Sequence, residues 1–292
     1  MLTLKEYRAK LNVLRNTRKM TKTMRMISVN KLHRAQGARE KASAFEQRLA
    51  GILGRLAAPA GFGGSSLASA RAAVRRTHVL VLSSDRGLCA GFNSNLCRAV
   101  VQWAAARRSE GIEVSLSFAG KRGFLFLKSR GLAGRLYEGA TARPGPAEGR
   151  AIAADLKAAF LSGECGEVYV AWNRFRTLLT QAPSIERLLP VSIPETEGGA
   201  IPVGADDLLE PDRAVVLGVV LDRFVDMKVL SALLDSSVGE HAARMMAMEN
   251  ATRNADELIE KFTLLKNRAR QAAITRELME IISGAEALAK TA

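Results

Sequence analysis

A loop that carries two glycines is the segment of this chain best placed to do chemistry. The run THVLVLS (77–83) is typical of a buried strand, and SSDRGLCAGFNSNL (83–96) leads from it toward a helix. A strand, a glycine-bearing turn and a helix form the arrangement of many phosphate sites. The loop fits neither GxGxxG nor GxxxxGK, however, and no lysine follows Gly91 to meet a phosphate. We therefore interpret it as a structural turn that an ion pair between Asp85 and Arg86 fixes.

The histidines and cysteines do not form a reactive set. No serine, cysteine or carboxylate cluster accompanies any of the histidines, which are His33 and His241 in helical patterns and His78 at the start of a strand. The cysteines lack CxxC or Cys/His ligand spacing and are expected to pack as small apolar residues: Cys89, Cys97 and Cys165. The sequence therefore predicts no catalytic residue, no cofactor and no metal site.

Positive charge is concentrated at the N-terminal end. The chain carries a net charge of +14 with a pI near 10.2, and residues 1–41 hold twelve Lys or Arg against two Glu. Such a segment favours an acidic partner. Nucleic acid is one candidate, although Tyr7 is the only aromatic residue in the basic stretch available for base stacking. An acidic protein collar fits the same charge.

The sequence predicts long helices at both ends of the chain, and the N-terminal helix carries the basic segment. In the C-terminal part, apolar residues recur at alternating steps of three and four: Met248, Ala251, Ala255, Leu258, Phe262, Leu265, Ala269 and Ala272. The N-terminal part repeats the alternation in two phases, first Leu4, Tyr7, Leu11 and Leu14, then Ala35, Ala38, Ala42, Phe45, Leu49, Ile52 and Leu56. This is the pattern of an antiparallel coiled coil, with a distortion expected near Thr17. Methionines of both arms are expected to pack in its seam, Met20, Met24 and Met26 among them.

The middle of the chain has the pattern of a small α/β domain. Strands are expected at 77–83, 112–118 and 168–172, and helices from Asn93 or Ser94 to about 108 and at 121–128 and 151–161. The segment 175–190 could add a strand, 194–204 is expected to be an excursion, and helix resumes near Asp212. Strands that alternate with helices predict a parallel sheet covered by helices. We thus expect three parts: 1–58, 75–205, and 212–288, the last pairing with the first.

No segment is expected to cross a membrane. The longest apolar run, 214–221, is far shorter than the roughly 18 residues that a span needs, and it ends at Asp222 and Arg223. The start, MLTLKEYRAK, has no apolar signal-peptide core. We expect a soluble protein in a bacterial cytoplasmic setting.

Several blocks of the sequence resemble the ATP synthase gamma subunit family. They are NTRKMTKTMRMISVNKLHRAQ (16–36), SSDRGLCAGFNSNL (83–96), EHAARMMAMENATRNADELI (240–259) and NRARQAAITRELMEIISGAEAL (267–288), in the family's order. The resemblance implies a coiled-coil shaft inside a ring of alternating alpha and beta subunits, with a Rossmann-like α/β domain at its foot. It implies a rotor that couples ion flow to ATP synthesis or hydrolysis at the beta subunits and is itself non-catalytic.

The same resemblance implies partners and contact residues. The partners are the alpha, beta and epsilon subunits and the membrane c-ring, with one copy of the chain per complex, no nucleic acid, and a peripheral place on the cytoplasmic side of the bacterial inner membrane. MTKTMRM would place Met24 and Arg25 at acidic beta loops. The other contacts to the hexamer would be Arg244, Arg270, Gln271, Thr275 and Glu277. A basic coiled coil that binds nucleic acid is the second interpretation, and a nucleotide-using α/β enzyme is the third.

The chain departs from the family pattern at a few positions. ISVN (27–30) stands where the family has small residues, and His33 and Arg276 replace commoner neighbours. Serine and asparagine are poor helix formers, so we expect looser packing around Ser28 and Asn30. No insertion with paired cysteines is found, and thiol switching is not expected.

Overall fold

The structure is a computed structural model that describes residues 3–57, 61–62, 65–71, 74–192 and 209–289. Contacts between residues divide it into two compact units, and the division passes through both long helices. The helical unit is Met1–Ile27 with Met245–Ala292, and the sheet unit is Ser28–Arg244. The three parts expected from the sequence follow elements rather than these units, and that division stays a prediction.

Ten helices and strands are assigned in the described residues. In chain order they are α1 (Leu4–Ala57), β1 (Arg76–Leu82), α2 (Phe92–Ser109), β2 (Glu113–Ala119), α3 (Lys121–Lys128), β3 (Gly134–Tyr137), α4 (Pro146–Leu161), β4 (Glu167–Phe175), β5 (Gln181–Leu189) and α5 (Arg213–Ala289). None of the described helices contains a stretch long and apolar enough to cross a bilayer.

The sheet has the strand order β3-β2-β1-β4-β5. Strands β3, β2, β1 and β4 are parallel, and β5 pairs with β4 in the antiparallel direction. The expected parallel sheet is therefore correct for four strands. The missed strand, β3, is four residues long, and the segment 175–190 that sequence left open contains the edge strand β5.

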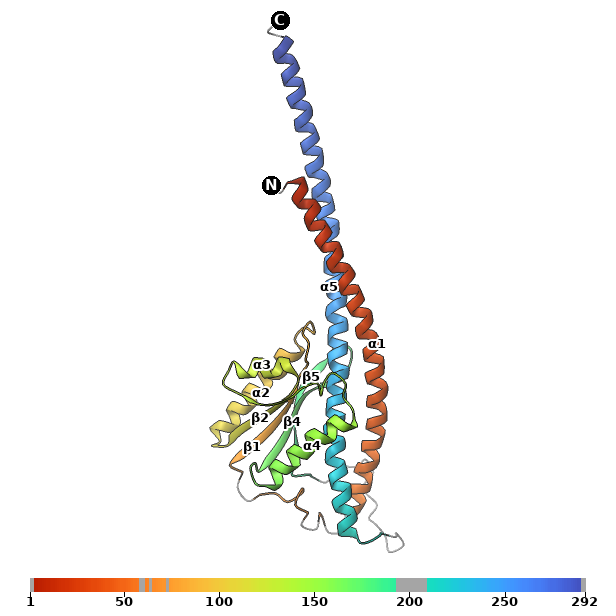
Figure 1. Cartoon of the computed structure of the whole chain (residues 1–292), viewed down its shortest axis with the longest axis vertical. Helices are drawn as coiled ribbons and strands as arrows, with labels where there is room; N and C mark the ends of the chain where they lie inside the picture. Colours follow the sequence, from red (N-terminus) through yellow and green to blue (C-terminus); the bar gives the residue numbers. More distant parts are fainter. Residues whose placement is uncertain (1–2, 58–60, 63–64, 72–73, 193–208, 290–292) are drawn as a thin grey trace. The chain divides into compact units, whose positions relative to one another are not determined.

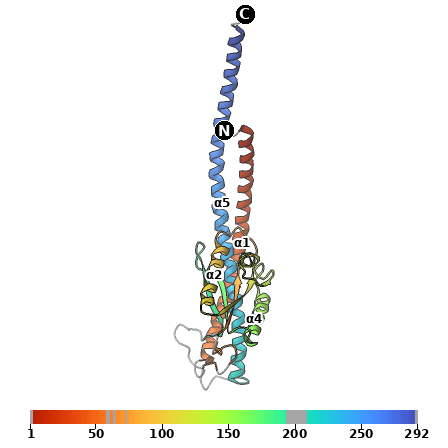
Figure 2. The same cartoon turned by 90° about the vertical axis from the view of Figure 1, so that its left-hand side faces the viewer.

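Side chains of β1 alternate between the two faces of the sheet, as the pleat of a strand requires. Val79 and Val81 belong to a buried cluster with residues of α2 and α3, whereas Leu80 and Leu82 belong to a second cluster with α4 and the sheet-unit parts of α1 and α5. Helices α2 and α3 thus cover one face and α4 covers the other (Figures 1 and 2). This layered sheet, with the pairing of the N- and C-terminal helices, confirms the predicted fold class.

One glycine is required where β1 meets the turn between β2 and α3. Gly120 has φ +112, and a Cβ on it would lie 2.2 Å from the backbone oxygen of Ser83. The Ser83 hydroxyl donates to the Gly120 carbonyl at 3.0 Å and accepts from the Gly123 amide at 2.9 Å. The close approach therefore joins the carboxyl ends of two neighbouring strands.

Helix α1 has one continuous seam, and the expected change of phase near Thr17 is wrong. A single alternation of three and four runs through buried and half-buried positions from Leu4 to Leu56: 4, 7, 11, 14, 21, 25, 28, 32, 35, 39, 42, 46, 49, 53 and 56, with the half-exposed Arg18 in the same phase. Three of the seven residues of the second predicted set fail, because Ala38, Phe45 and Ile52 are exposed. Arg39, Glu46 and Leu53, one residue later in each case, hold the seam instead.

The seam predicted for α5 is also wrong at some positions. Met248, Ala251, Ala255, Phe262, Leu265 and Ala269 are buried or half-buried as expected, whereas Leu258 and Ala272 are exposed. Thr252 and Ile259 occupy the alternate half of the seam. Thr252 donates to Thr21 of α1 at 2.8 Å, so a polar pair fills a position that an apolar count cannot find. Ser28 is buried at 2% exposure, and the looser packing expected around Ser28 and Asn30 stays a prediction.

The remaining expected elements agree with the structure to within a few residues. Helix α4 begins five residues earlier than expected, at Pro146, where proline suits the first helical turn. The expected cap on α2 is wrong: Gly91 precedes the helix, and no side chain caps it. The expected excursion at 194–204 lies outside the described residues.

Candidate partner-contacting surface

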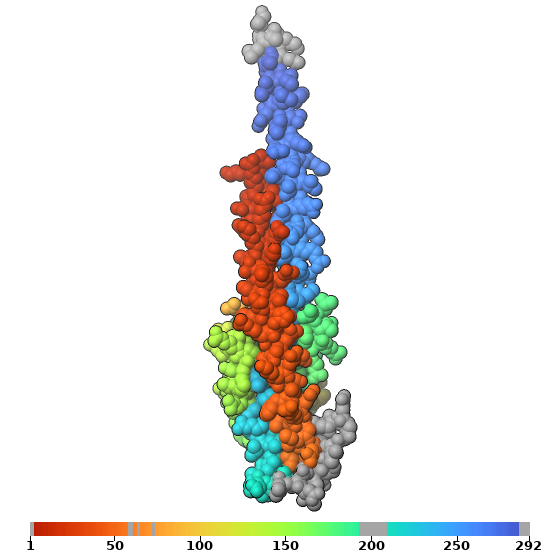
Figure 3. Space-filling view, turned by 90° about the vertical axis from the view of Figure 1, so that its right-hand side faces the viewer, coloured from red at the N-terminus to blue at the C-terminus, as the bar shows by residue number. Residues whose placement is uncertain are grey.

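The C-terminal end of α5 is the most exposed part of the helical unit. Helix α1 begins at Leu4, while α5 continues to Ala289, beyond the N-terminal end of α1 (Figures 1 and 3). Five large apolar side chains of this end are 44–69% exposed: Ile274, Leu278, Met279, Ile281 and Ile282. A run of exposed apolar side chains on a helix indicates a surface that another chain covers.

Four of the predicted contact residues lie on this end of α5. Arg270, Gln271, Thr275 and Glu277 are all exposed, and the described part of the chain gives none of their side chains a hydrogen bond or an ion pair. At helical spacing, Arg270 and Glu277 share a stripe with Ile274 and Ile281. The neighbouring stripe holds Gln271, Thr275, Leu278 and Ile282. The surface therefore combines apolar area with polar groups that are available to a partner.

Met24 and Arg25 lie elsewhere in the helical unit and are half-buried. The guanidinium of Arg25 forms an ion pair with Glu249 of α5, so this arginine already has a partner within the chain. The outward side of the same segment carries Met20 at 65% exposure and Met26 at 59%. These two methionines were expected in the seam; they face outward because neither occupies a position of the continuous heptad.

Arg244 is buried in the sheet unit and does not face solvent. Its guanidinium donates to the carbonyl oxygens of Arg86 and Gly87, each at 3.2 Å, and lies 2.8 Å from the carboxylate of Glu240. Burial raises the pKa of Glu240, and Arg244 opposes that shift. Burial also lowers the pKa of His241 to about 4, with Arg244 and Lys31 adding to the effect.

The turn that Arg244 holds displays one leucine. Leu88 has φ +64 and is 62% exposed, and Ala90 has φ +48. Left-handed backbone at residues other than glycine costs free energy and persists only where neighbouring groups impose it. Cys89, between them, is buried in a cluster with Phe92 and Ala243. Sequence analysis found Arg244 but missed Leu88, because positive φ angles leave no signal in residue type here.

The comparisons with known proteins decide the family. The model of the ATP synthase family matches residues 3–288. The chain belongs to this family. An ATP synthase gamma chain of Geobacter sp. (strain M21) is 40% identical over 288 residues, covering 99% of each chain. One of Anaeromyxobacter sp. (strain Fw109-5) is 40% identical over 292 residues, covering 99% of this chain and all of the relative.

Solved structures of ATP synthases share the fold. A chain of the Euglena gracilis mitochondrial ATP synthase, solved with OSCP, F1 and the c-ring, matches with a TM-score of 0.66 at 18% identity, covering 98% of this chain and 94% of that one. A chain of the Tetrahymena thermophila central stalk and c-ring matches with a TM-score of 0.59 at 22% identity, covering 80% and 99%. The family resemblance and the fold class expected from the sequence are therefore confirmed.

In this ATP synthase family member, side chains of the chain itself contact the carboxyl end of β1, the edge where a doubly wound sheet binds nucleotides. The Ser236 hydroxyl of α5 donates to the carbonyl of Leu82 at 3.3 Å, at the end of β1. Asp85 does not pair with Arg86, which corrects the sequence expectation. Its two oxygens accept from the Lys121 amide at 3.1 Å and the Thr141 hydroxyl at 3.0 Å. The turn is therefore built as a structural joint.

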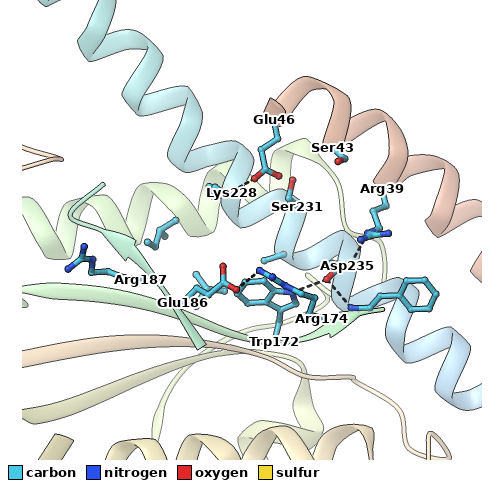
Figure 4. Close-up of a pocket in the computed structure, with 14 residues that line it drawn as sticks. Arg39, Ser43, Glu46, Trp172, Arg174, Glu186, Arg187, Lys228, Ser231 and Asp235 are labelled. Atoms are coloured by element: carbon cyan, nitrogen blue, oxygen red, sulfur yellow. Dashed lines mark hydrogen bonds and ion pairs between the residues drawn. The ribbon is translucent and has the colours of Figure 1, made fainter. Parts of the chain in front are cut away.

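A cavity of about 340 Å³ lies in the sheet unit, between the sheet and the two long helices (Figure 4). Asp235 of α5 connects its walls. One carboxylate oxygen accepts from the Trp172 indole at 3.0 Å and from the Phe175 amide at 3.1 Å, and the other lies 2.7 Å from Arg39 of α1. A single buried carboxylate thus joins α5 to α1 and to β4.

Within the described residues, four ion pairs connect α1 to α5, two in each unit. In the helical unit they are Arg18–Asp256 at 2.6 Å and Arg25–Glu249. In the sheet unit they are Arg39–Asp235 at 2.7 Å and Glu46–Lys228 at 2.7 Å. The residue numbers of every pair add up to 274, so all four follow one antiparallel register. Three of the four α1 residues are basic, and Glu46 is acidic.

Proposed function

We propose that this chain is the central-stalk rotor of an F-type ATP synthase. Ion flow turns it inside a hexamer of alpha and beta subunits, and its asymmetry drives the beta catalytic sites through successive conformations of ATP synthesis or hydrolysis. The observation that carries the proposal is 40% identity to ATP synthase gamma chains over the full length of the chain. The paired helices and the uncovered end of α5 give that identity a physical basis.

The exposed end of α5 supplies the contact with the hexamer in this proposal. Arg270 and Glu277 offer charged hydrogen-bonding groups, and Ile274 and Ile281 on the same stripe offer apolar area. Exposed ion pairs contribute at most about 1 kcal/mol each, so contacts of this kind can be broken as the shaft turns. Arg244 acts differently: it shapes the turn that displays Leu88, and its effect on a partner passes through that turn.

The foot of the rotor is proposed to meet the epsilon subunit and the membrane c-ring, with one copy of the chain per complex. Solved chains with this fold come from assemblies that contain F1 and a c-ring. The location that follows is peripheral, on the cytoplasmic side of the bacterial inner membrane. The chain itself makes and breaks no bond, because ATP chemistry belongs to the beta subunits. The buried thiols suit this role, since burial raises the pKa of Cys97 to about 11 and that of Cys165 to about 11.

The test is reconstitution with purified alpha and beta subunits. The wild-type chain is expected to join one hexamer as a single copy and to raise its ATP turnover. The variants Arg270→Ala and Glu277→Ala remove charged groups of α5 that have no bonding partner in the described chain, and each is expected to lower turnover several-fold. Arg98→Ala, at an exposed position of α2, is the control and leaves turnover unchanged.

One outcome of this experiment contradicts the rotor assignment, and another contradicts the contact residues alone. If no hexamer forms around the wild-type chain, and the chain is instead retained on DNA in a salt-sensitive manner, the basic helix serves nucleic acid. If the complex forms but the two α5 variants behave like Arg98→Ala, the rotor assignment still holds, but Arg270 and Glu277 are not the residues that contact the hexamer.

A further inference from the structure

The Glu46–Lys228 pair reverses the polarity of the ion pairs between α1 and α5. Both pairs of the helical unit, and Arg39–Asp235 in the sheet unit, place the cation on α1 and the acid on α5. Glu46 places an acid on α1 opposite a lysine of α5, 2.7 Å away. Both pairs of the sheet unit line the cavity of Figure 4, where dashed lines mark them.

The apolar seam of a coiled coil discriminates poorly between the native register and a register shifted by one heptad. Sliding one helix by seven residues returns the same heptad positions to the interface. In the observed register Leu49 is level with Val225 and Ala42 with Ala232, because these numbers also add up to 274. A slide of one heptad sets Leu49 level with Ala232, and the opposite slide sets Ala42 level with Val225. Apolar residues meet apolar residues in all three registers.

The charges of the sheet unit separate these registers. When the numbers add up to 281, Glu46 is level with Asp235, and two acids meet. When they add up to 267, Arg39 is level with Lys228, and two cations meet. The side chains of Asp235 and Glu46 are only 11% and 20% exposed, so water and salt screen the repulsion between them less than at an open surface.

The pairs of the helical unit do not have this property. In the shifted register where facing residue numbers add up to 281, Arg25 is level with Asp256. In the register where they add up to 267, Arg18 is level with Glu249. Both meetings are attractive, because the two pairs have the same polarity. Charge selects the register only where the polarity alternates.

We propose that the reversed Glu46–Lys228 pair fixes the register of α1 against α5 in the sheet unit, by placing like charges together after a one-heptad slide in either direction. The function of the pair is thus selection among registers rather than added stability. Partner residues lie 182 positions apart in the sequence, so the chain must find this register between segments that no short turn aligns. The proposal is independent of the rotor assignment.

An exchanged pair tests this selection without removing the interaction. In the double variant Glu46→Lys with Lys228→Glu, the native register keeps all four attractive pairs. A slide to 281 would set the new cation at position 46 level with Asp235, and a slide to 267 would set Arg39 level with the new acid at position 228, so both slides become attractive. The matched neutral variant, Glu46→Gln with Lys228→Gln, removes the pair and creates no attractive charge pair in either shifted register. If the pair only stabilises the native state, the exchanged variant should fold at least as well as the neutral one.

The readout is the distance between spin labels on the full chain after unfolding in urea and refolding. Labels are placed on Gln47→Cys and Val219→Cys, two exposed positions of α1 and α5, while the three native cysteines are buried. A slide of seven residues changes the axial separation of the labels by about 10 Å, at about 1.5 Å per residue. The wild-type chain is expected to give one distance, and the neutral chain, which has lost both like-charge meetings, a smaller native fraction than wild type. The exchanged chain is expected to give a second distance, or a smaller native fraction than the neutral chain.

A second exchange controls for charge reversal in general. Arg18→Asp with Asp256→Arg also preserves its native pair, but it creates like-charge meetings after either slide, so this chain is expected to keep one distance. The proposal is overturned if the Glu46–Lys228 exchange refolds to a single native distance with a native fraction equal to or above that of the neutral variant.

Discussion

At the scale of single residues, His241 links the stability of the sheet unit to pH. Burial lowers its pKa to about 4, and the cations of Arg244 and Lys31 contribute to that shift, while an unfolded histidine titrates near 6.5. Between these two pKa values, His241 is protonated in the unfolded chain and neutral in the folded chain. The contribution of His241 to folding is therefore present above about pH 6.5 and is lost as the pH falls toward 4.

The variant His241→Gln should lose this part of the pH dependence. We expect the wild-type free energy of unfolding to fall relative to that of the variant by on the order of 2 kcal/mol between pH 7 and pH 4.5. Urea titrations followed by circular dichroism at the two pH values measure this difference. Glu240, whose pKa is raised, contributes with the opposite sign but is common to both proteins. Parallel profiles for the two proteins would show that His241 does not titrate in this way.

Arg244 should matter for the fold before it matters for any partner. Arg244→Ala leaves the buried carboxylate of Glu240 without its cation and the carbonyls of Arg86 and Gly87 without their donor. Breaking a buried pair from one side costs about 3–5 kcal/mol. We expect a loss of that size in urea unfolding, together with faster amide exchange in residues 85–91.

The double variant Arg244→Met with Glu240→Gln distinguishes the cause of this loss. It removes both charges, so it should recover stability relative to Arg244→Ala while exchange in the turn stays fast. Equal losses in the two variants would mean that the turn contacts, rather than the unpaired carboxylate, account for the cost.

At the scale of elements, the structure shows where the heptad pattern misleads. Ile52 was expected in the seam of α1 but is 46% exposed, whereas its neighbour Leu53 is fully buried. Leu53→Ala should lower the free energy of unfolding by about 2–5 kcal/mol, as buried leucines do. Ile52→Ala should cost within about 1 kcal/mol. Thermal and urea unfolding of the two variants gives the ranking, and the reverse order would restore the seam expected from apolar residues alone.

Strand and helix positions were predictable where residue type and burial agree. THVLVLS predicted β1 correctly, because alternate residues of a central strand are buried on both faces. Apolar spacing identified four of the seven seam residues predicted in the second set of α1 and six of the eight predicted in α5. Arg39 and Glu46 could not be found in this way, because they hold their seam positions through ion pairs with residues of α5 that lie far along the chain. Nothing in the local sequence of α1 marks these two charged residues as half-buried members of the seam.

The features of the candidate site also fall into those that the sequence predicted and those that it missed. Arg270 and Glu277 came from a local motif, and their exposure agrees with a contact role that stays a prediction. The exposed apolar stripe beside them was present in the sequence, but it was indistinguishable from a buried seam until the end of α1 was known. Leu88 needed backbone angles that residue type does not encode.

At the scale of the whole molecule, stability and assembly should depend on different parts of the chain. The end of α5 after Ala273 has exposed side chains through Ala285, and the described residues give it no ion pair with any other element. An isolated helix of this length is marginal in water, so its order contributes little to the rest of the fold. Its apolar side chains gain burial only when another chain covers them.

A chain that stops after Ala273 therefore separates the two properties. Its midpoint of urea unfolding should match that of the full chain, because the missing segment adds no described contact to either unit. In reconstitution with alpha and beta subunits, the same truncation should lower the amount of complex and the ATP turnover, since about 1 kcal/mol or more of burial per large apolar side chain would be lost. A truncated chain that unfolds at lower urea would show that the segment packs within the chain. A truncated chain that assembles and supports full turnover would place the partner-contacting surface elsewhere, with the turn that Arg244 holds as the remaining candidate.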